Sequence, residues 1–465
     1  MISSAGFWIC NEHENAMVKA TLKVGVSGVR GIVGDSLTPQ IAASFAQAFG
    51  VLIGSGPVVV GRDTRPTGKM LEYAVTAGLK SVGCEPVIAG VVSTPTLLHL
   101  TKDLDVRGGI CITASHNAVP WNALKFVDRD GMFLNEGAAQ ELFDVYHQEH
   151  FPLVEESRLR AIRYVEDPFW KHEEAILDYV DVDAIRAAKF KVALDACNGA
   201  GAVYAPAFLE KLGCEVHVVH GAPTGVFERE PEPTPESLGA LSACVKENGC
   251  DIGFAQDPDA DRLALVNELG EPMGEDLTLA LGIEQVLRHH GTGPIAVNLS
   301  SSKAIDFVAR RHDCPVTRTR IGEINVSSAM VELGAVAGGE PNGGLIIPAI
   351  HPCRDSFAAM AILLELMALS RQSIQTLREE IPIYHIIKEK LPIRGDQAPG
   401  ILRKLRRHFE GEKLNLIDGV FADLGDKWFH VRPSNTESVI RVLAEAPSAE
   451  EAKALVDMLK ALITS

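Results

Sequence analysis

The sequence has too little positive charge for a protein that works on nucleic acid. Its 465 residues include 44 Lys and Arg against 61 Asp and Glu, which gives a formal net charge of −17. Affinity for the phosphate backbone of DNA or RNA depends on a net basic surface. The acidic balance therefore argues against a nucleic-acid partner. It also requires that any anionic substrate be bound by a few cations gathered at one place.

Long hydrophobic runs and paired cysteines are missing as well. The apolar stretch 358–369 contains Glu365 and is shorter than the roughly 20 residues that cross a bilayer, so we expect no membrane-spanning helix. Nine cysteines are scattered without a Cys-x-x-Cys pair, as is typical of small core residues in a reducing compartment. Residues 1–16 lack the basic region of a secretory signal. We therefore expect a cytoplasmic protein with no membrane partner.

A β-branched run followed by a helical segment, a turn and a second β-branched run occurs three times. The copies cover residues 57–90, 191–221 and 294–322, and the first two share the tripeptide Gly-Cys-Glu at the turn. Strand, helix and strand in this order are typical of α/β domains with largely parallel sheets. The repeat therefore predicts three similar α/β units in one chain.

The C-terminal part has a different pattern. A basic helical segment at 403–409 is followed by a strand pair at 415–431 and an amphipathic helix from Ser448, which indicates a smaller α+β domain. The predicted fold class is α/β, with three similar mixed-sheet α/β domains plus a C-terminal α+β domain. The predicted boundaries are 1–20 for a tail, 21–165, 166–266 and 267–380 for the α/β domains, and 381–465 for the α+β domain.

Ser115 follows a predicted strand, at the edge of the sheet where α/β proteins bind ligands. In the segment GGICITASHN the residues Thr-Ala-Ser-His-Asn come directly after an apolar run. Ser115 is therefore a candidate nucleophile, with His116 and Lys125 near enough in sequence to stabilise an incoming phosphate. A serine turn that caps the next segment is the alternative interpretation.

Asp257, Asp259 and Asp261 alternate in the segment DPDADR, between two apolar runs. A period of two points them to one side of an extended segment, where three carboxylates repel one another unless a cation joins them. Hard oxygen ligands of this kind suit Mg²⁺ or Ca²⁺. An EF-hand is excluded, because Arg262 stands where its loop needs glycine and the flanking residues resemble strands. We predict a Mg²⁺ site; a solvated acidic turn is the alternative.

Two glycine-rich segments carry further polar residues. GGEPNGG at 338–344 presents the carboxylate of Glu340 and the amide of Asn342, which suit hydroxyl groups better than phosphates. GVSGVRG at 25–31 is a turn that carries Arg30. Each segment by itself is equally well explained as a plain turn.

A fourth segment, RPSNTESVIRV, is suited to holding an anion. Arg432 and Arg441 bracket Ser434, Asn435 and Thr436, and so combine guanidinium groups with hydroxyl and amide donors. A proline-marked turn before an edge strand is the alternative. Each predicted domain carries one of these features. They are, in chain order, the hydroxyl nucleophile, the carboxylates, the hydroxyl-binding segment and the anion cradle. Together they indicate a phosphosugar bound in a central cleft between the domains.

These motifs, in this order, resemble those of the α-D-phosphohexomutases, the superfamily of phosphoglucomutase, phosphomannomutase and phosphoglucosamine mutase. GVSGVRG is similar to the family's G-T-[DS]-G-[IV]-R-G, and TASHN is similar to its active-serine signature. DPDADR stands where D-G-D-G-D-R is common, and RPSNTE resembles the phosphate loop R-P-S-G-T-E. GEPNGG occupies the sugar-binding position, and together with WNALK it resembles the phosphoglucosamine mutase subgroup most. The resemblance implies three similar α/β domains and an α+β domain around a central cleft.

The resemblance implies a role for each candidate residue. Ser115 would carry the phosphoryl group, and an oxygen of that phosphate would bind Mg²⁺ together with Asp257, Asp259 and Asp261. The other catalytic residues would be His116, Lys125, Arg30 and Arg262. The substrate would contact Glu340, Asn342, Arg432, Ser434, Asn435, Thr436, Arg441 and Arg320.

The implied reaction consists of two phosphoryl transfers. Phosphoserine gives its phosphoryl group to a hexose phosphate, and the resulting hexose 1,6-bisphosphate, which is also the activator, turns over and returns its other phosphoryl group to the serine. Mg²⁺ neutralises charge on the transferring group. The general base is open among His116, Lys125 and a carboxylate of the aspartates. The expected partner is a small hexose phosphate, and the expected assembly is a monomer or a homodimer.

The sequence departs from the family at a few positions. Ala118, Pro258 and Ala260 affect backbone shape only, and we expect them to be tolerated. Gly344 replaces a histidine of many relatives and removes an expected contact, so the choice among glucosamine, mannose and glucose phosphates stays open. Two other classes of function are disfavoured. A non-catalytic binding homologue would lack Ser115 or one of the aspartates, and all four are present. A metal-dependent phosphatase would admit water to the phosphoserine, which a cleft closed by the fourth domain should exclude.

Overall fold

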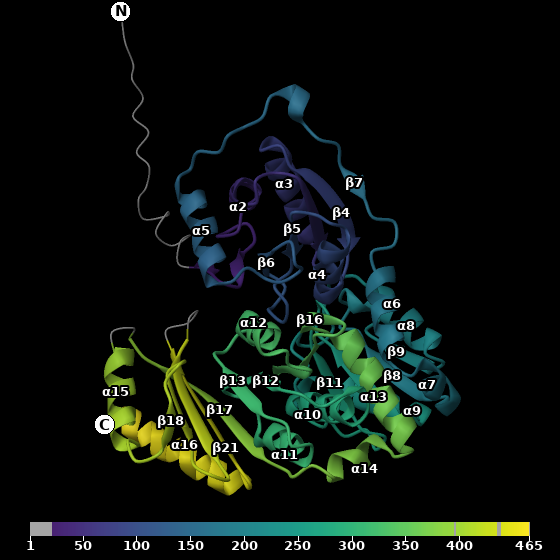
Figure 1. The fold of residues 1–465 in the computed structure, drawn as a ribbon, viewed down its shortest axis with the longest axis vertical. Coiled ribbons are helices and arrows are strands. Elements are labelled where there is room, and N and C mark those ends of the chain that lie inside the picture. The colour runs from purple at the N-terminus through teal and green to yellow at the C-terminus, as the bar shows by residue number, and fades with distance from the viewer. Residues whose placement is uncertain (1–20, 395–396, 435–438, 465) are drawn as a thin grey trace, which may run out of the picture.

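The computed structural model describes residues 21–394, 397–434 and 439–464, and Figure 1 shows four units that follow one another along the chain. Each unit is built around a β-sheet of its own. Among the described residues, no helix is both long and apolar enough to cross a membrane.

The first unit has a seven-stranded sheet in the order β1-β2-β6-β5-β3-β4-β7. Strands β3, β4, β5 and β7 are parallel, and β6 joins β5 antiparallel. The strands are β1 (Lys23–Gly25), β2 (Gly28–Ile32), β3 (Pro57–Arg62), β4 (Glu85–Val91), β5 (Gly108–Ile112), β6 (Trp121–Val127) and β7 (Arg163–Tyr164). The helices are α2 (Pro39–Leu52), α3 (Gly68–Ser81), α4 (Thr94–Asp103) and α5 (Glu136–His147).

The second unit has a four-stranded sheet in the order β11-β10-β8-β9, with β11 antiparallel to the rest. Its strands are β8 (Lys191–Asp195), β9 (Glu215–Val219), β10 (Ile252–Gln256) and β11 (Leu263–Val266). Its helices are α6 (Trp170–Tyr179), α7 (Val182–Ala188), α8 (Gly201–Lys211) and α9 (Gly239–Asn248).

The third unit has a five-stranded sheet in the order β13-β12-β14-β15-β16, in which β13, β12 and β14 are parallel. Its strands are β12 (Ile295–Asn298), β13 (Val316–Thr319), β14 (Ala337–Glu340), β15 (Gly344–Ile347) and β16 (His351–Arg354). Its helices are α10 (Glu275–Gln285), α11 (Lys303–Arg311), α12 (Glu323–Leu333), α13 (Ser356–Ser370) and α14 (Ile374–Glu379).

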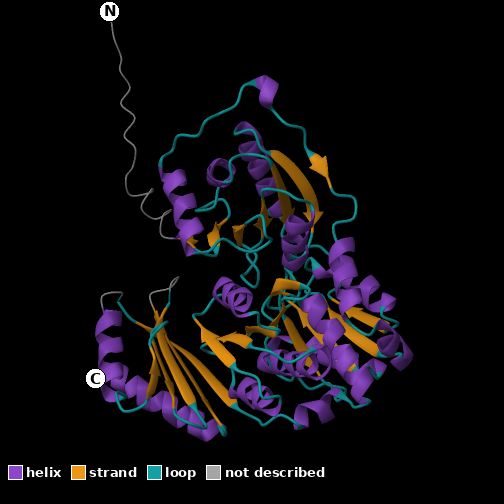
Figure 2. Cartoon of the chain, in the orientation of Figure 1, coloured by secondary structure: helices purple, strands orange, loops and turns teal. Residues whose placement is uncertain are grey.

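The fourth unit has a five-stranded antiparallel sheet in the order β17-β21-β20-β19-β18. Residues of both its helices join one core cluster with alternate residues of the sheet, so the helices cover a single face, as Figure 2 shows. Its elements are β17 (His385–Pro392), α15 (Ala398–His408), β18 (Lys413–Asn415), β19 (Val420–Asp423), β20 (Trp428–Pro433), β21 (Val439–Ala446) and α16 (Ala449–Thr464).

The three repeats predicted from the sequence are parallel β-α-β units. They are β3-α3-β4, β8-α8-β9 and β12-α11-β13, and the two strands of each unit pair in parallel. Helices pack on both faces of the first three sheets, because alternate residues of the central strands, such as Val59 and Val60, belong to different core clusters. The predicted fold class, three mixed-sheet α/β domains and a C-terminal α+β domain, is confirmed.

The second and third units share one continuous hydrophobic core, which contains both Phe254 of β10 and Phe357 of α13. Helix α13 is apolar around its whole circumference, as expected for a helix buried between two sheets, and the carboxylate of Asp355 caps its N-terminus. The fourth unit meets the third through a smaller apolar cluster of Leu299, Phe421 and Trp428. The loops of the second and third units are therefore held rigidly together, and the fourth unit is joined to them less extensively.

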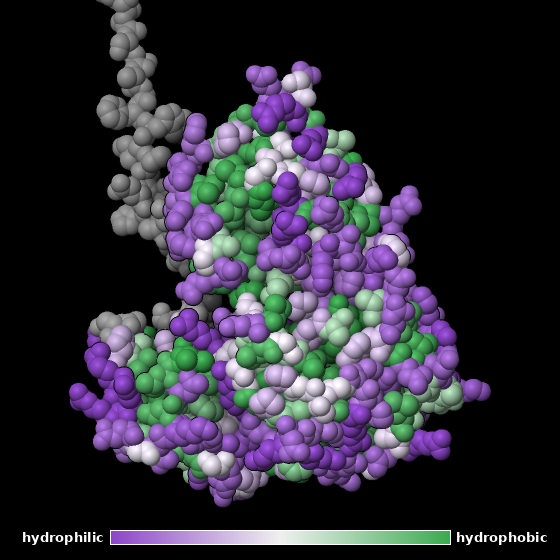
Figure 3. Space-filling view, viewed as in Figure 1, coloured by the Kyte–Doolittle hydropathy of each residue, from purple (hydrophilic) through white to green (hydrophobic). Residues whose placement is uncertain are grey.

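Hydrophilic side chains cover much of the outer surface that Figure 3 shows. The same view shows an indentation between the first unit and the fourth. The serine, aspartate and glycine loops described next lie where the first, second and third units meet.

Candidate functional site

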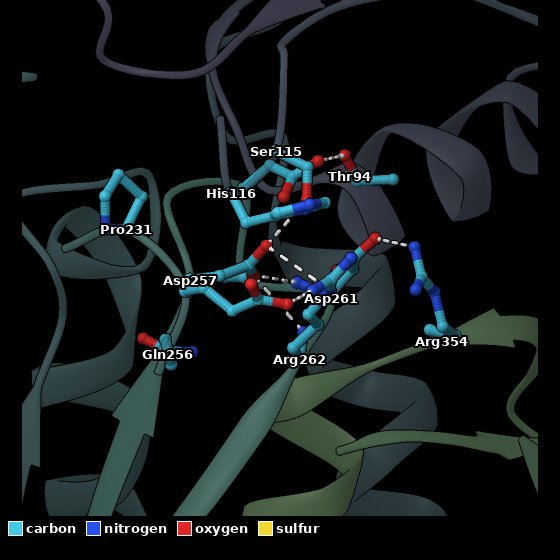
Figure 4. A network of polar contacts seen from close by, with 12 residues as sticks. Thr94, Ser115, His116, Pro231, Gln256, Asp257, Asp261, Arg262 and Arg354 are labelled. Carbon is cyan, nitrogen blue, oxygen red and sulfur yellow. Dashed lines mark hydrogen bonds and ion pairs between the residues drawn. The ribbon is translucent and has the colours of Figure 1, made fainter. Parts of the chain in front are cut away.

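Ser115 lies in the serine loop (113–117), which follows β5 and leads back to β6. Its backbone has a φ of 48°, a left-handed conformation that costs a non-glycine residue about 1 to 2 kcal/mol. The side chain is buried, and its hydroxyl donates a hydrogen bond of 2.7 Å to Oδ2 of Asp257 (Figure 4). The amide of Ser115 donates to Oγ1 of Thr113 at 2.9 Å. A strained backbone therefore holds a buried hydroxyl against a carboxylate of another domain.

The guanidinium of Arg65 holds the serine loop in this conformation. Arg65 is fully buried, and its Nη2 donates to the carbonyl oxygens of Ser115 at 2.6 Å and Asn117 at 2.7 Å. Nη1 donates to two further carbonyl oxygens of the segment that leads to β6, at 3.0 and 3.2 Å. Nε donates to Oδ2 of Asp63 at 3.0 Å. Four hydrogen bonds of the guanidinium thus hold the segment, and the fifth joins it to Asp63.

Arg65 and Asp63 are functional residues that were not predicted, although the sequence carries a signal for them. Both belong to the segment GRDTR, which continues β3 past its C-terminal end. Because β3 pairs in parallel with β5, polar residues after β3 arrive at the same sheet edge as Ser115.

The aspartate loop (257–262) is the turn between the antiparallel strands β10 and β11. Asp257, Asp259 and Asp261 are fully buried, and one oxygen from each lies within 4.8 Å of the others. Ala260 has a φ of 54°, so it adopts the left-handed conformation that glycine adopts without strain. The predicted convergence of the three carboxylates is therefore present at the end of β10.

Each aspartate keeps one oxygen for a donor of the protein. Oδ1 of Asp257 accepts two backbone N–H groups of its own loop, at 3.2 and 3.3 Å. Oδ2 of Asp259 accepts from Lys125 at 2.9 Å and Thr94 at 2.7 Å, and Oδ2 of Asp261 accepts from Arg354 at 2.5 Å.

The other oxygens of the cluster are available to a cation. Among the described residues, Oδ1 of Asp259 and Oδ1 of Asp261 are buried and accept no hydrogen bond, and Oδ2 of Asp257 accepts one from the hydroxyl of Ser115. Nε of Arg262 lies 4.0 Å from Oδ2 of Asp257 and 3.8 Å from Oδ1 of Asp261. Unpartnered buried carboxylate oxygens are costly in a protein interior. The residues therefore fit a metal ion, held by one oxygen from each of the three aspartates beside Ser115.

Cations surround this buried negative charge. Burial alone lowers the pKa of Lys125, but Asp259 and Asp261 more than offset it, so the net pKa lies above the ordinary lysine value. Burial, reinforced by Arg262 and Arg30, lowers the pKa of His116 to about 2 and keeps its imidazole neutral. Nδ1 of that imidazole lies 3.4 Å from the Oγ of Ser115.

Arg30 and Arg262 also lie at this cluster. Nη1 of Arg30 donates to Oδ1 of Asn117 in the serine loop at 2.6 Å. Nη1 of Arg262 donates to Glu232 at 2.8 Å, while its buried Nε makes no hydrogen bond and lies 3.8 Å from Asp261. Glu232 was not singled out in the sequence, because it belongs to a long loop of the second unit without a recognisable motif.

The glycine loop (338–344) joins β14 to β15 in the third unit. Oε1 of Glu340 accepts from Nδ2 of Asn298 and from the amide of Gly322, both at 2.9 Å. Oε2 accepts from Nη1 of Arg354 at 3.2 Å. The Oδ1 of Asn342 is buried without a hydrogen-bond partner. The loop therefore presents a fixed carboxylate and an amide oxygen near the aspartate loop.

The arginine loop (432–436) belongs to the fourth unit, and the structure describes its residues 432–434. Arg432 and Arg441 are cross-strand neighbours on β20 and β21, and Ser434 donates its amide to the carbonyl of Val439. Burial lowers the pKa of Arg432, while Asp418 and Glu340 favour its charged form. Asn435 and Thr436 lie outside the described residues.

Arg320 lies at the rim between three units. Its side chain is 58% exposed, its Nε donates to the carbonyl of Ile417 in the fourth unit at 2.9 Å, and its Nη1 lies 3.8 Å from Glu136 of the first. No contact of Arg320 with Ser115 or the aspartate loop is present among the described residues.

Known proteins share this architecture over nearly the whole chain. The four phosphoglucomutase/phosphomannomutase domains, alpha/beta/alpha domains I, II and III and the C-terminal domain, match residues 21–152, 170–270, 275–384 and 388–462. A crystal structure of a phosphoglucomutase/phosphomannomutase family protein from Burkholderia thailandensis is similar with a TM-score of 0.82 and 25% identity. The match covers 96% of this chain and 97% of that one.

Three named relatives are similar to this chain over most of its length. A "Probable phosphoglucosamine mutase" of Methanopyrus kandleri is 38% identical, with 93% of this chain and 96% of the relative covered. A phosphoglucomutase/phosphomannomutase of Thermococcus kodakarensis is 36% identical over 93% and 96%. A phosphoglucosamine/phosphogalactosamine mutase of Sulfurisphaera tokodaii is 33% identical over 94% and 98%. The chain belongs to the phosphoglucomutase/phosphomannomutase family and is a phosphohexomutase.

Proposed function

We propose that the protein interconverts the 6-phosphate and 1-phosphate of a hexosamine, as a phosphoglucosamine mutase. The observation that carries the proposal is the hydrogen bond from the Ser115 hydroxyl to Asp257, which joins a nucleophile of the first unit to the carboxylate cluster of the second. The names of the relatives from Methanopyrus kandleri and Sulfurisphaera tokodaii support the amino sugar. Phosphomannomutase or phosphoglucomutase activity by the same mechanism is the second candidate, which the Thermococcus relative supports.

The proposed cofactor is Mg²⁺, and hexose 1,6-bisphosphate is the proposed activator and intermediate. Asp257, Asp259 and Asp261 would hold the cation through one oxygen each, together with an oxygen of the phosphate on Ser115. The cation supplies charge neutralisation at the transferring phosphoryl group. Lys125, Arg30 and Arg262 stabilise the same negative charge from the protein side.

The reaction proceeds in two transfers. In the first, the bond between Ser115 Oγ and phosphorus breaks, the free hydroxyl of the hexose phosphate bonds to phosphorus and gives its proton to a base, and Oγ takes up a proton. In the second, after the bisphosphate turns over, Oγ gives its proton to a base and bonds to the phosphorus at the other end; the bond between that phosphorus and the sugar oxygen breaks, and the sugar oxygen takes up a proton. Two groups lie within reach of the Ser115 proton, Oδ2 of Asp257 at 2.7 Å and Nδ1 of His116 at 3.4 Å.

Binding residues hold the non-reacting end of the sugar phosphate during each of the two transfers. We assign sugar hydroxyls to Glu340 and Asn342, and the non-reacting phosphate to Arg432 and Arg441, with Ser434, Asn435 and Thr436 completing that cradle. Arg320, at the rim, is assigned a weaker contact with the entering substrate. Guanidinium groups match the geometry of a phosphate, which supports this assignment.

The experiment that tests the function is a comparison of three substrates. Purified protein with Mg²⁺ and a trace of the matching 1,6-bisphosphate is given glucosamine, mannose or glucose 6-phosphate, and ³¹P NMR follows the 1-phosphate. We expect the largest kcat/KM for glucosamine 6-phosphate. Release of inorganic phosphate without a 1-phosphate would mean a phosphatase, and no change in any substrate would mean a binding protein.

We further propose a cytoplasmic enzyme that acts on a small hexose phosphate as a monomer or homodimer, without a nucleic-acid or membrane partner. The eight described cysteines are free thiols, which supports a reducing compartment. Light scattering coupled to gel filtration measures the mass of the assembly, and a mass above that of a dimer would contradict this proposal.

A further inference from the structure

Arg354 connects the aspartate loop to the glycine loop. It is the last residue of β16 and is buried, and the three nitrogens of its guanidinium each donate to a different carboxylate. Nη2 donates to Asp261 at 2.5 Å, Nη1 to Glu340 at 3.2 Å and Nε to Glu323 at 3.1 Å. Figure 4 shows it on the side of Asp261 that faces away from Ser115. A single guanidinium thus fixes one residue from each loop.

The sequence makes room for this guanidinium at Gly344. A Cβ atom built on Gly344 would lie 2.3 Å from Cδ and 2.8 Å from Cγ of Arg354, which is closer than real Cβ atoms come to their neighbours. Any side chain at 344 would therefore push Arg354 out of its present position. The glycine that stands at 344, where many relatives have histidine, thus leaves the space that the side chain of Arg354 occupies.

The contact of Arg354 limits how Asp261 can bind a cation. Because Oδ2 of Asp261 already accepts the short hydrogen bond from Arg354, Oδ1 is the oxygen left without a partner. In the same way, Oδ2 of Asp259 accepts a hydrogen bond from Lys125, and Oδ1 of Asp257 accepts from two backbone amides. Each aspartate is thereby restricted to one oxygen.

Single-oxygen carboxylates distinguish between the two common hard cations. Mg²⁺ requires a compact octahedral set and takes one oxygen from each carboxylate, whereas Ca²⁺ is larger, takes six to eight oxygens and readily accepts both oxygens of one carboxylate. Freeing the second oxygen of Asp261 would add a ligand to the set. That change favours Ca²⁺ over Mg²⁺.

We propose that Arg354 is a positioning residue that sets the cation preference of the aspartate loop, by restricting Asp261 to one oxygen and holding that loop in register with Glu340. A lysine in its place could not do this, because an ammonium group lacks the planar fork that reaches three carboxylates at once. The proposal rests on the metal site of the proposed function and adds a residue that determines its selectivity.

The test measures the dissociation constants of Mg²⁺ and Ca²⁺ by calorimetry, without substrate, in wild-type protein and in two variants. Arg354→Met removes the guanidinium, and Gly344→Ala keeps it but displaces it. Gly239→Ala is the matched control, because a Cβ there meets nothing within 4 Å. Circular dichroism and the melting temperature report whether each variant is folded.

We expect both variants, but not the control, to shift the ratio of the two constants toward Ca²⁺ by about tenfold. A ratio within about twofold of wild type in folded Gly344→Ala protein would overturn the proposal, even if Arg354→Met does not fold. A changed ratio in Arg354→Met together with an unchanged ratio in Gly344→Ala would also overturn the proposal. The positive charge of Arg354, and not its position, would then set the cation preference. If wild-type protein binds neither cation, the metal site of the proposed function fails as well.

Discussion

Replacing Arg65 by methionine tests how the serine loop is held. The change removes five N–H donors from a fully buried side chain and leaves Asp63 as a buried carboxylate without its guanidinium. Breaking a buried ion pair from one side costs about 3 to 5 kcal/mol. Several of the carbonyl oxygens are only partly buried, so water can replace some of their lost donors. We therefore expect a loss of about 4 kcal/mol in the free energy of unfolding.

The same substitution should affect turnover separately from stability. Without Arg65 the carbonyl oxygen of Ser115 loses its hydrogen bond, so the left-handed backbone at Ser115 is no longer held in place. A displacement of the nucleophile by about 1 Å costs roughly 100-fold in rate. Urea unfolding followed by circular dichroism gives the stability, and a mutase assay at low temperature, where the variant is folded, gives kcat.

Arg163→Met is the control for this experiment. Arg163 also forms an ion pair at 2.8 Å, with Glu85, but its side chain is 52% exposed, so its loss should cost no more than about 1 kcal/mol. If Arg65→Met costs as little as this control and keeps turnover within about threefold of wild type, the serine loop does not depend on Arg65.

Three further predictions concern substrate, metal and pH. Arg432→Ala should raise KM by about 10- to 100-fold and leave kcat nearly unchanged, because it removes a bidentate donor from the end of the substrate that does not react; an unchanged KM would contradict this. Removal of divalent cations with a chelator should stop turnover and added Mg²⁺ should restore it, whereas full activity in chelator would exclude the metal. Burial, opposed by Lys388, raises the pKa of Asp276 from 3.8 to about 7. The folded protein then keeps a proton that the unfolded chain loses near pH 4, so Asp276 contributes stability at low pH that is lost as the pH rises toward 7. Asp276→Asn should flatten this dependence of the melting temperature, and an unaltered pH profile would contradict the assignment.

Local patterns predicted much of the fold and the centre of the site. The β-α-β repeats could be recognised because a parallel unit needs a strand, a helix and a strand within one stretch of sequence. Ser115 and the three aspartates could be recognised because each group lies in one short segment at the end of a strand. The period of two in the aspartate loop predicted the convergence of its carboxylates.

The residues that orient these groups could not be predicted in the same way. Arg65 and Glu232 contact loops that are distant in sequence within their own units, and Arg354 reaches from the third unit to Asp261 of the second. Such contacts depend on how segments far apart in the chain meet in the fold. The backbone of Ala260 is another feature that the sequence did not predict. Its position indicated a tolerated substitution for glycine, but not that its backbone is left-handed. Within the part of the chain that the structure describes, Arg320 has no contact with Ser115 or the aspartate loop, although it lies close in sequence to Glu340.

The net charge of −17 is compatible with an anionic substrate because of how the charge is distributed. Arg30, Lys125, Arg262 and Arg354 are gathered around the three buried aspartates, while hydrophilic groups spread over the outer surface. Such an arrangement concentrates positive potential where a phosphate reacts and leaves the acidic excess elsewhere.

Phosphorylation of Ser115 is the step on which the proposed mechanism depends most. Protein incubated with hexose 1,6-bisphosphate and Mg²⁺ is analysed by intact-mass and peptide mass spectrometry, for the wild type and for Ser115→Ala. We expect one phosphoryl group on Ser115 in the wild type, none in the variant, and loss of nearly all mutase turnover. A phosphoryl group on another residue, or a variant that keeps about a tenth or more of the wild-type rate, would contradict the assignment of Ser115 as the phosphoryl carrier.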